Sequence, residues 1–379
     1  MRSESIHDRL TSEYILKGVN ALKYDAIGVQ WTDLAYGMDF INAEKLPWVT
    51  SNWNDAAFEA ERRITRNGKT IAFFNWIDPR ESPQRQMQAT AMDGGSAENA
   101  GAVFRPSHEL TAENNDSAAL LQSLQRAKQE GATIVLATTL KLAEAQQLFS
   151  LTHVDILLVR SAYEKYAEPK KIENTLVLQP GSRGMRMAEL DVTLNANGTI
   201  KSWQHRIIPL PKTIPDAKRL AGWYKEYNAR VKADYEKGVQ LAKAAQSGAS
   251  PYAGEQVCQT CHAAEHKIWH GSRHGHAYGT LRRVNKAFDP NCIVCHTVGF
   301  NTPGGFIDDD TTPHLSNVQC ESCHGAAQAH ATSGGTQPVA NANWPREKIC
   351  AQCHTQAHSP SFNVDVYWPK IQHKRAPKP

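Results

Sequence analysis

In this 379-residue chain, the most informative absences are those of particular residue types from particular segments. The first 257 residues contain no cysteine, and no methionine follows Met187. No apolar run approaches the ~20 residues of a membrane-spanning helix. The net charge is only +4 and no basic cluster stands out, which gives no reason to expect a nucleic-acid partner. With 41% hydrophobic and 21% charged residues, the composition is that of a globular protein rather than a disordered one.

Cysteine and histidine divide the chain into two parts of different composition. All eight cysteines lie between Cys258 and Cys353, and twelve of the sixteen histidines lie at or after His262. A chain of this length can form two or three domains. We therefore expect three segments: an α/β domain over residues 1–212, a linker helix and hinge over 213–250, and a cysteine-rich domain over 251–379.

The cysteines all belong to one repeated pattern, C-x-x-C-H, which is the attachment motif of c-type heme. Two thiols at that spacing reach the two vinyl groups of one porphyrin, and the next histidine is held under the iron as an axial ligand. The sequence therefore predicts four covalent hemes. The attachment residues are Cys258, Cys261, Cys292, Cys295, Cys320, Cys323, Cys350 and Cys353, and the proximal ligands are His262, His296, His324 and His354.

Two other uses of paired cysteines explain this pattern less well. Structural zinc sites also contain C-x-x-C pairs, but they do not require a histidine after each pair. At the histidine content of this chain, four such coincidences have a chance of roughly a few in a million. Disulfides explain neither the fixed spacing nor the histidines.

The second axial ligand of each iron is expected to be histidine, because the heme-binding segment contains no methionine. Eight histidines lie there outside the motifs, and four would suffice for bis-histidine ligation of every heme. Our candidates, in order, are His274, His276, His330, His314 and His373. We expect the other three at the surface or beside heme propionates; they are His266, His270 and His358.

Four hemes within residues 251–379 leave little room for a conventional apolar core. We therefore expect a mainly helical and irregular domain in which the porphyrins form the core and short helices and Gly/Pro-rich loops wrap them. Porphyrins packed so closely would form an electron conduit, a role that needs no substrate pocket.

The segment from Tyr252 to His373 resembles the cytochrome c-554 family of tetraheme cytochromes. The matching features are Tyr252-Ala-Gly254, Trp269 with Ser272-Arg-His274-Gly-His276-Ala277, Cys292-Ile-Val-Cys-His-Thr-Val-Gly-Phe300, Gly304-Gly-Phe306, Val318-Gln-Cys-Glu-Ser-Cys-His-Gly325 with His330 beyond it, Ser359-Pro-Ser-Phe362 and Tyr367-Trp-Pro-Lys-Ile-Gln-His373. The resemblance implies electron transfer through closely spaced heme pairs, with His274 and His330 as distal ligands. It also implies that one iron can lack a distal ligand and bind small molecules.

Ahead of this segment, residues 215–245 are expected to form one helix. Pro215 suits a first helical position, and Asp216 suits the positive end of the helix dipole. An aromatic and apolar stripe at three- and four-residue spacing indicates a face that docks on a neighbouring domain, or else binds a partner. The stripe consists of Leu220, Trp223, Tyr224, Tyr227, Val231 and Tyr235.

Helical and strand patterns alternate in the first 210 residues, which predicts a layered α/β domain. We expect helices over residues 14–22, 117–130 and 140–148. Strands are expected over 26–29, 48–51, 70–74, 133–138, 155–159 and 175–179, followed by a hairpin of 187–194 with 199–209.

This half resembles the calcineurin-like metallophosphoesterase fold of the 5′-nucleotidase family. The matching segments are Ala21-Leu-Lys-Tyr-Asp-Ala26 through Tyr36-Gly37, Val154-Asp-Ile-Leu-Leu158, Thr175-Leu-Val-Leu-Gln-Pro-Gly-Ser182 and Leu190-Asp-Val-Thr-Leu194. Where that family places its metal ligands, this chain has Trp31, Thr32, Thr139, Ser161 and Tyr163. These side chains cannot hold two metal ions, so we do not expect a phosphoesterase. The family's opening strand, which carries the first ligands, is also missing.

C-type heme is attached outside the cytoplasm, which predicts a periplasmic or extracellular protein. The first eight residues contain no apolar segment of a signal peptide. We therefore expect that the signal has been removed or that Met1 is an internal start.

The sequence leaves three functions open. The first is an electron-transfer cytochrome whose degenerate phosphoesterase domain is a scaffold or docking surface, with an unidentified redox donor and acceptor. The second is a multiheme oxidoreductase that acts on a small nitrogen or sulfur compound at an open heme. The third is a homo-oligomeric subunit of a heme-lined filament.

Overall fold

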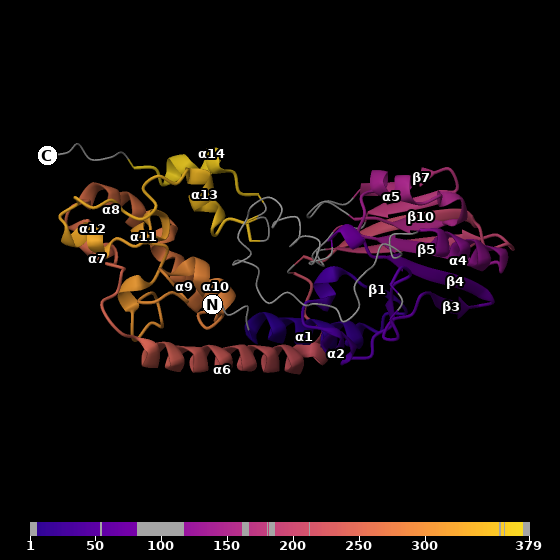
Figure 1. Ribbon diagram of the computed structural model, residues 1–379, viewed down its shortest axis with the longest axis horizontal. Helices are drawn as coiled ribbons and strands as arrows, with labels where there is room; N and C mark the ends of the chain where they lie inside the picture. The colour runs from indigo at the N-terminus through magenta and orange to yellow at the C-terminus, as the bar shows by residue number, and fades with distance from the viewer. Residues whose placement is uncertain are drawn as a thin grey trace. The chain divides into compact units, whose positions relative to one another are not determined.

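A computed structural model describes residues 6–53, 55–81, 117–160, 167–179, 181, 186–211, 213–355, 358–359 and 361–373. The chain divides into two compact units (Figure 1). The N-terminal unit is Asp8–Lys218, and the C-terminal unit is Arg219–Pro379 together with Met1–His7. Within the described ranges, no helix combines the length and the apolar character needed to cross a lipid bilayer.

A six-stranded mixed sheet forms the centre of the N-terminal unit, in the order β3-β4-β5-β6-β8-β7. Strands β4, β5, β6 and β8 run parallel, and β3 and β7 pair antiparallel at the two edges. The parallel strands are short apolar runs because both faces of the sheet are covered. The bounds are β3 Arg62–Arg66, β4 Lys69–Trp76, β5 Thr133–Thr138, β6 Ile156–Leu158, β7 Ala167–Ile172 and β8 Thr175–Gln179.

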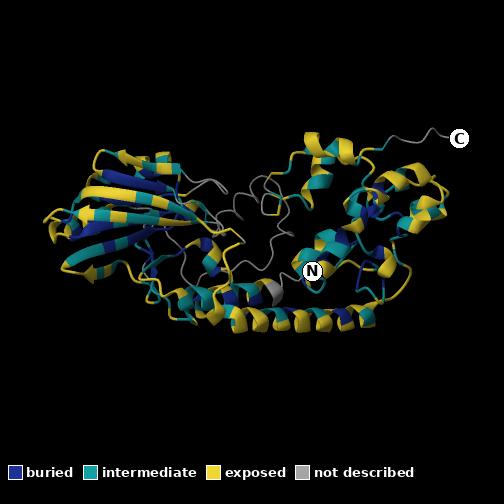
Figure 2. Ribbon diagram, turned by 180° about the vertical axis from the view of Figure 1, so that it is seen from behind, coloured by how far each residue is buried: buried dark blue, intermediate teal, exposed yellow. Residues whose placement is uncertain are grey.

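The two faces of this sheet bury alternate residues of the same strands (Figure 2). One face packs against helices α4 (Ala118–Gln129) and α5 (Leu142–Leu148), where Ile134 and Leu136 of β5 join Leu120 and Leu124 of α4. On the other face, Val135 joins a separate apolar cluster with residues of the β9–β10 hairpin. The hairpin strands are β9 Arg186–Leu194 and β10 Ile200–Pro209. The unit is therefore an α/β layered domain.

A tryptophan-rich cluster packs beside this sheet. It contains Trp31, Trp48 and Trp53, with Leu34, Ile41 and Ile77. Apart from α1, the elements that carry it are short. They are α1 Ile6–Leu22, β1 Ile27–Gly28, η1 Trp31–Leu34, α2 Met38–Asn42, β2 Trp48–Val49 and η2 Pro79–Glu81; η5 Leu151–His153 lies before β6.

The predicted strands and helices of this unit are present; the first helix begins at Ile6 rather than at Tyr14, and the other ends differ by at most two residues. The prediction missed β3 and β7, both edge strands. Their sequences, Arg-Arg-Ile-Thr-Arg and Ala-Glu-Pro-Lys-Lys-Ile, are polar because an edge strand has one neighbour and remains largely exposed. Asn67 and Gly68 join β3 to β4 with φ values of 50° and 72°, the left-handed backbone that a tight hairpin turn requires.

The C-terminal unit is mainly helical and irregular, as the sequence predicts. Apart from one long helix, its helices are short, and loops join them. Their bounds are η6 Lys218–Leu220, α6 Ala221–Ala245, α7 Glu255–Gln259, α8 Ala263–His270, η7 His274–His276, α9 Ala277–Arg283, α10 Pro290–His296, η8 Pro313–Leu315, α11 Cys320–His324, α12 Gln328–Thr332, α13 Arg346–Ala351, α14 Val364–Tyr367 and η9 Trp368–Lys370.

Helix α6 packs against the rest of this unit along its aromatic stripe. It begins at Ala221 rather than at Pro215, because a 3-10 turn precedes it. Tyr235 donates from its hydroxyl to the carbonyl of Ile307 at 3.2 Å, and Lys243 pairs with Asp308 at 2.7 Å. Tyr235 of the stripe therefore contacts a loop of the C-terminal unit, whereas Tyr224 is 48% exposed.

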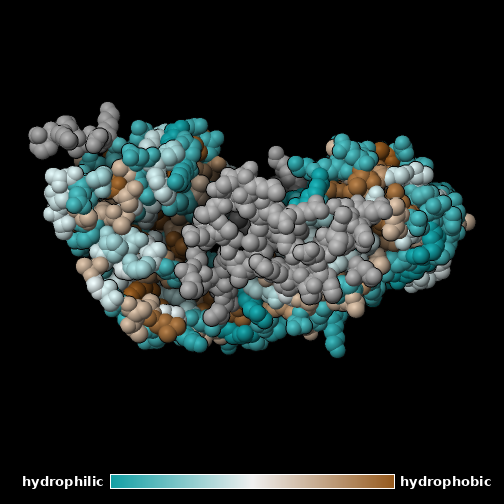
Figure 3. Space-filling model, viewed as in Figure 1, coloured by the Kyte–Doolittle hydropathy of each residue, from teal (hydrophilic) through white to brown (hydrophobic). Residues whose placement is uncertain are grey.

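A small apolar core is also present in the C-terminal unit, which corrects the expectation that porphyrins alone would form it. Its buried members are Tyr278, Leu281, Ile293, Val298, Phe306 and Leu315. They lie around α9 and α10, where Tyr278 and Phe306 pack with ring centroids 5.3 Å apart. On the face seen in Figure 3, other apolar side chains of this unit remain at the surface among hydrophilic ones. The exposed apolar residues of the unit include Val257, Ile268, Val294 and Val366.

Asp155, beside the sheet of the N-terminal unit, is 5% exposed, and its contacts predict that its loss destabilises this unit. Its carboxylate accepts from Lys128 Nζ at 2.5 and 2.6 Å and from the Ile134 amide at 2.8 Å, and so joins α4, β5 and β6. Asp155→Ala leaves a largely buried ammonium unpaired and should lower the free energy of unfolding of this unit by about 3 kcal/mol. Urea unfolding of the full chain, followed by circular dichroism, measures the change.

The matched control is Asp25→Ala, which removes an ion pair with Arg66 whose side chains are 72% (Arg66) and 52% (Asp25) exposed. A solvent-exposed pair contributes about 0–1 kcal/mol. Equal losses from the two variants would contradict the role given to Asp155.

Candidate heme-binding site

The four C-x-x-C-H motifs lie on or directly after short helices, and one helical turn explains their spacing. The His262 amide donates to the Cys258 carbonyl at 2.9 Å, and the His354 amide donates to the Cys350 carbonyl at the same distance. This hydrogen bond joins residues four positions apart in the chain, as in an α-helical turn. It brings the two thiols and the imidazole of a motif to one side of the turn. Helices α7, α10, α11 and α13 carry the four motifs in chain order.

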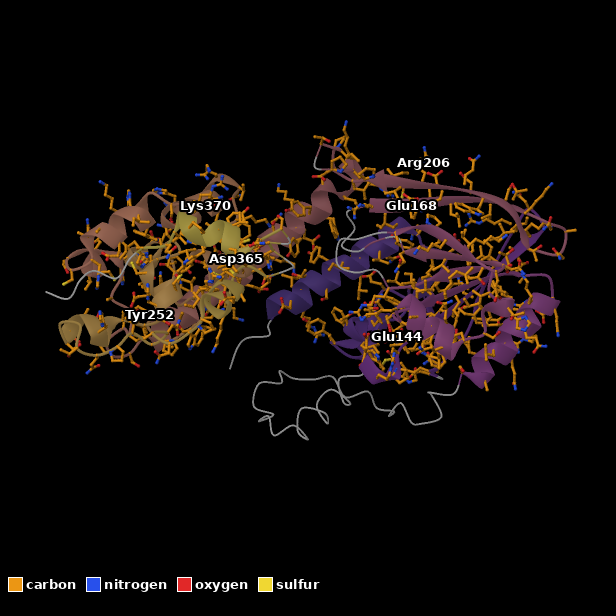
Figure 4. The ribbon with its side chains drawn as sticks, turned by 90° about the horizontal axis from the view of Figure 1, so that it is seen from above. Glu144, Glu168, Arg206, Tyr252, Asp365 and Lys370 are labelled. Carbon is orange, nitrogen blue, oxygen red and sulfur yellow. The ribbon has the colours of Figure 1, made fainter. Side chains whose placement is uncertain are left out.

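Local contacts position these helices. Asp289 caps α10 by accepting from the Asn291 amide at 3.2 Å, and Pro290 occupies the first turn. Asp365 of α14, labelled in Figure 4, accepts from Arg346 Nη2 of α13 at 2.6 Å. The last motif is thereby tied to the segment that leads to His373.

Thiols from different motifs meet in two pairs. Cys258 of the first motif shares a hydrogen bond with Cys320 of the third, and this bond raises the pKa of Cys258 and lowers that of Cys320. Cys295 of the second motif shares one with Cys353 of the fourth, which lowers the pKa of Cys295 to about 7. The chain therefore brings the first motif against the third and the second against the fourth.

Three of the four motif histidines each lie opposite a histidine from outside the motifs. His262 and His330 have ring centroids 6.3 Å apart, His274 and His354 6.1 Å, and His324 and His373 5.9 Å. Two imidazoles that bind one metal ion from opposite sides, with bonds of about 2 Å, have ring centroids roughly 6 Å apart. These three pairs fit the axial ligation of a heme.

The tautomers of these rings also fit. The Nδ1 atom of His330 donates to the Gln337 carbonyl at 2.6 Å, and that of His373 donates to the Ile371 carbonyl at 3.2 Å. His296 Nδ1 donates to the Ala277 carbonyl at 2.8 Å. A proton held on Nδ1 leaves the lone pair of Nε2 free to bind iron.

Partial desolvation lowers the pKa of three of these imidazoles, which favours the neutral form that binds a metal. Desolvation lowers the pKa of His324 and His354. For His274, desolvation lowers the pKa first, and nearby His354 and His296 lower it further. His274 thus lies near two motif histidines but has its ring contact with His354.

The remaining histidines of the unit do not face a motif imidazole among the described residues. The rings of His276 and His270 contact each other at 5.3 Å, and no ring contact involves His314. The Nε2 atom of His266 is engaged by Glu255, and His358 Nδ1 lies 3.1 Å from Thr355 Oγ1. His296 differs from the other motif histidines, because none of the described histidines forms a ring contact with it.

In the N-terminal unit, the Trp31 side chain, at one of the expected metal-ligand positions, has a structural contact. Trp31 is buried and donates from Nε1 to the Asp78 carbonyl at 2.7 Å. The Asp78 carboxylate in turn binds the guanidinium of Arg80, which also lies 3.5 Å from Glu144, labelled in Figure 4. Ser161 and Tyr163 lie outside the described residues. Over the described part of the chain, no group of three histidine, cysteine or acidic side chains could hold a metal ion.

The repeated motifs are typical of multiheme c-type cytochromes, and part of the chain resembles known proteins of that kind. The family model described as "Cytochrome c554 and c-prime" matches residues 257–325, which include the first three motifs. Cytochrome c-554 of Nitrosomonas europaea is 27% identical over 136 residues, covering 28% of this chain and 58% of that protein. The chain thus spans less than two thirds of this relative. The matched segment is therefore similar to a c-type cytochrome.

Solved structures resemble the chain more distantly. A 5′-nucleotidase precursor from Thermus thermophilus has a TM-score of 0.44 at 14% identity, over 60% of this chain and 47% of that one. The sulfate thiohydrolase SoxB of Thermus thermophilus has a TM-score of 0.45 at 18% identity, over 60% and 41%. Similarities this low do not assign a function to the N-terminal unit.

Proposed function

We propose that this protein is a tetraheme c-type cytochrome that carries electrons, with a non-catalytic N-terminal unit that is a scaffold or a docking surface. The observation that carries the proposal is the set of three facing imidazole pairs, each joining a motif histidine to one from outside the motifs. Zinc knuckles and disulfides give no reason for such pairs.

Under this proposal, each motif holds one heme through two thioether bonds and a proximal histidine. The distal ligands are His330 opposite His262, His373 opposite His324, and His274 opposite His354. Bound heme supplies reversible one-electron chemistry at its iron. The chain fixes the orientation of His330 and His373 through their Nδ1 hydrogen bonds to backbone carbonyls. His276 and His314, also candidates from the sequence, gain no support from these contacts.

The pairing of motifs favours transport. Motifs that meet through Cys258 and Cys320, and through Cys295 and Cys353, would hold their cofactors in two close pairs. Electrons could then pass along the chain without a substrate pocket. The redox donor and acceptor are other proteins, and c-type attachment implies a periplasmic or extracellular location.

One observation favours a second candidate function, an oxidoreductase that acts on a small nitrogen or sulfur compound. Among the described residues, no imidazole faces His296 as His330 faces His262. An iron bound by His296 alone would keep a vacant coordination position, which a substrate needs. Transport remains the primary proposal because three of the four motif histidines have a facing imidazole.

The first test is the number of covalent hemes. Because all eight cysteines belong to attachment motifs, the denatured protein should keep four hemes by mass spectrometry. A mass that matches the bare polypeptide, or a polypeptide with zinc, would overturn the proposal.

The second test concerns the distal ligands. His330→Ala, His373→Ala and His274→Ala should each convert one low-spin iron to high spin, because a deleted ligand leaves water or nothing in its place. Low-temperature EPR of the oxidised protein measures this change. The matched control, His276→Ala, should leave the spectrum unchanged. Conversion by the control and not by the other three would contradict the assignments.

The third test concerns the N-terminal unit. Because Trp31, Thr32 and Thr139 replace metal ligands, the purified protein should hydrolyse neither nucleotides nor phosphodiesters when manganese or zinc is added. Metal-dependent turnover above the rate without protein would show that this unit is a working phosphoesterase.

A further inference from the structure

A buried carboxylate links the third heme-attachment motif to the segment ahead of the first. Glu321, the residue between Cys320 and Ser322, is 4% exposed. Its Oε1 accepts from the amides of Ala253 at 3.0 Å and Ala327 at 2.8 Å, and its Oε2 accepts from the Gly254 amide at 2.9 Å. The three amides belong to loops, so no helix or strand supplies them with a partner.

A second buried side chain, Gln319, strengthens the same junction. Its Oε1 accepts from the Glu255 amide at 2.9 Å, and its Nε2 donates to the carbonyls of His314 and Ser316 at 2.7 Å each. Glu255 is the first residue of α7, the helix that carries Cys258. The start of the first motif is therefore held by two side chains from the edge of the third.

The backbone at this junction leaves little room for another arrangement. Gly254 has a φ of 80°, and a Cβ atom there would lie 3.2 Å from the His314 carbonyl oxygen. Tyr252, which precedes the junction and is labelled in Figure 4, is anchored by a contact of 3.0 Å between its hydroxyl and Thr302 Oγ1. Glu321 thus meets a loop whose position is already constrained.

The charge of Glu321 is not balanced by a cation. Within the described residues, its carboxylate forms no ion pair with lysine, arginine or histidine, and backbone amides are its partners. A buried negative charge acts through a low effective dielectric and stabilises the more positive state of a neighbouring redox group. The adjacent Cys320 and the nearby Cys258, which share a hydrogen bond, mark the first and third attachment sites.

We propose that Glu321 is a positioning residue with two effects, and this inference rests on the proposed function. It holds the first motif against the third, and its carboxylate lowers the reduction potentials of the hemes that these two motifs attach. Since reduction of a ferric iron removes one positive charge, an uncompensated anion beside it opposes that reduction.

The test compares three variants in a spectropotentiometric titration of the full-length holoprotein. Glu321→Gln keeps the size and removes the charge, and it should raise one or two of the four midpoint potentials. Glu321→Asp keeps the charge but shortens the reach, and it should change the magnetic coupling between hemes in EPR more than the potentials. The matched control is Glu347→Gln, near the fourth motif, where the side chain is 57% exposed and paired with Arg346. It should leave all four potentials unchanged.

Hydrogen–deuterium exchange of the wild-type protein tests the hydrogen bonds of the Glu321 carboxylate without a variant. The amides of Ala253, Gly254 and Ala327 should exchange slowly although they lie in loops, and Glu321→Gln should accelerate them. Unshifted potentials in Glu321→Gln, an equal shift in the control, or rapid exchange of these amides in the wild type would each overturn the inference. Absence of covalent heme from the wild type would instead overturn the proposed function, and slow exchange would still be expected.

Discussion

Hydrogen bonds from imidazole Nδ1 atoms to backbone carbonyls are the contacts on which the C-terminal unit depends. They orient His296, His330 and His373 and leave Nε2 unprotonated for a metal. Each acceptor is a main-chain carbonyl in a short helix or loop, so the ligand geometry depends on the path of the backbone.

The N-terminal unit shows the opposite arrangement. Its sheet, covered by α4 and α5 on one face and by the β9–β10 hairpin on the other, is held by apolar packing that needs no cofactor. Around Asp78, arginine and carboxylate side chains pair with one another. A stable scaffold with internally paired charges suits a structural or docking role, and selection for such a role would act on its surface rather than on a catalytic centre.

Both candidate functions use the same polypeptide features. Motif histidines that face a second imidazole favour electron transfer, whereas the second function rests on His296, which faces no imidazole among the described residues. The two roles are compatible, because an iron that binds a small molecule still exchanges electrons with its neighbour. The carboxylate of Glu321 adds a means of tuning, since a fixed charge near one pair of sites creates a difference in potential from the other pair.

The sequence by itself predicted four heme-attachment motifs, because the spacing of C-x-x-C-H is set by covalent chemistry that does not depend on the fold. Periodicity also located the apolar strands such as Thr133–Thr138, since burial on both faces requires apolar residues. The periodicity of the sequence did not indicate β3 and β7, because these strands are polar and pair with their neighbours through backbone atoms. Only the tertiary structure decided which histidines face each other, that His276 contacts His270, and that Glu321 meets Ala253 and Gly254. These contacts join residues distant in sequence, often through backbone atoms, which every residue type carries and no motif records.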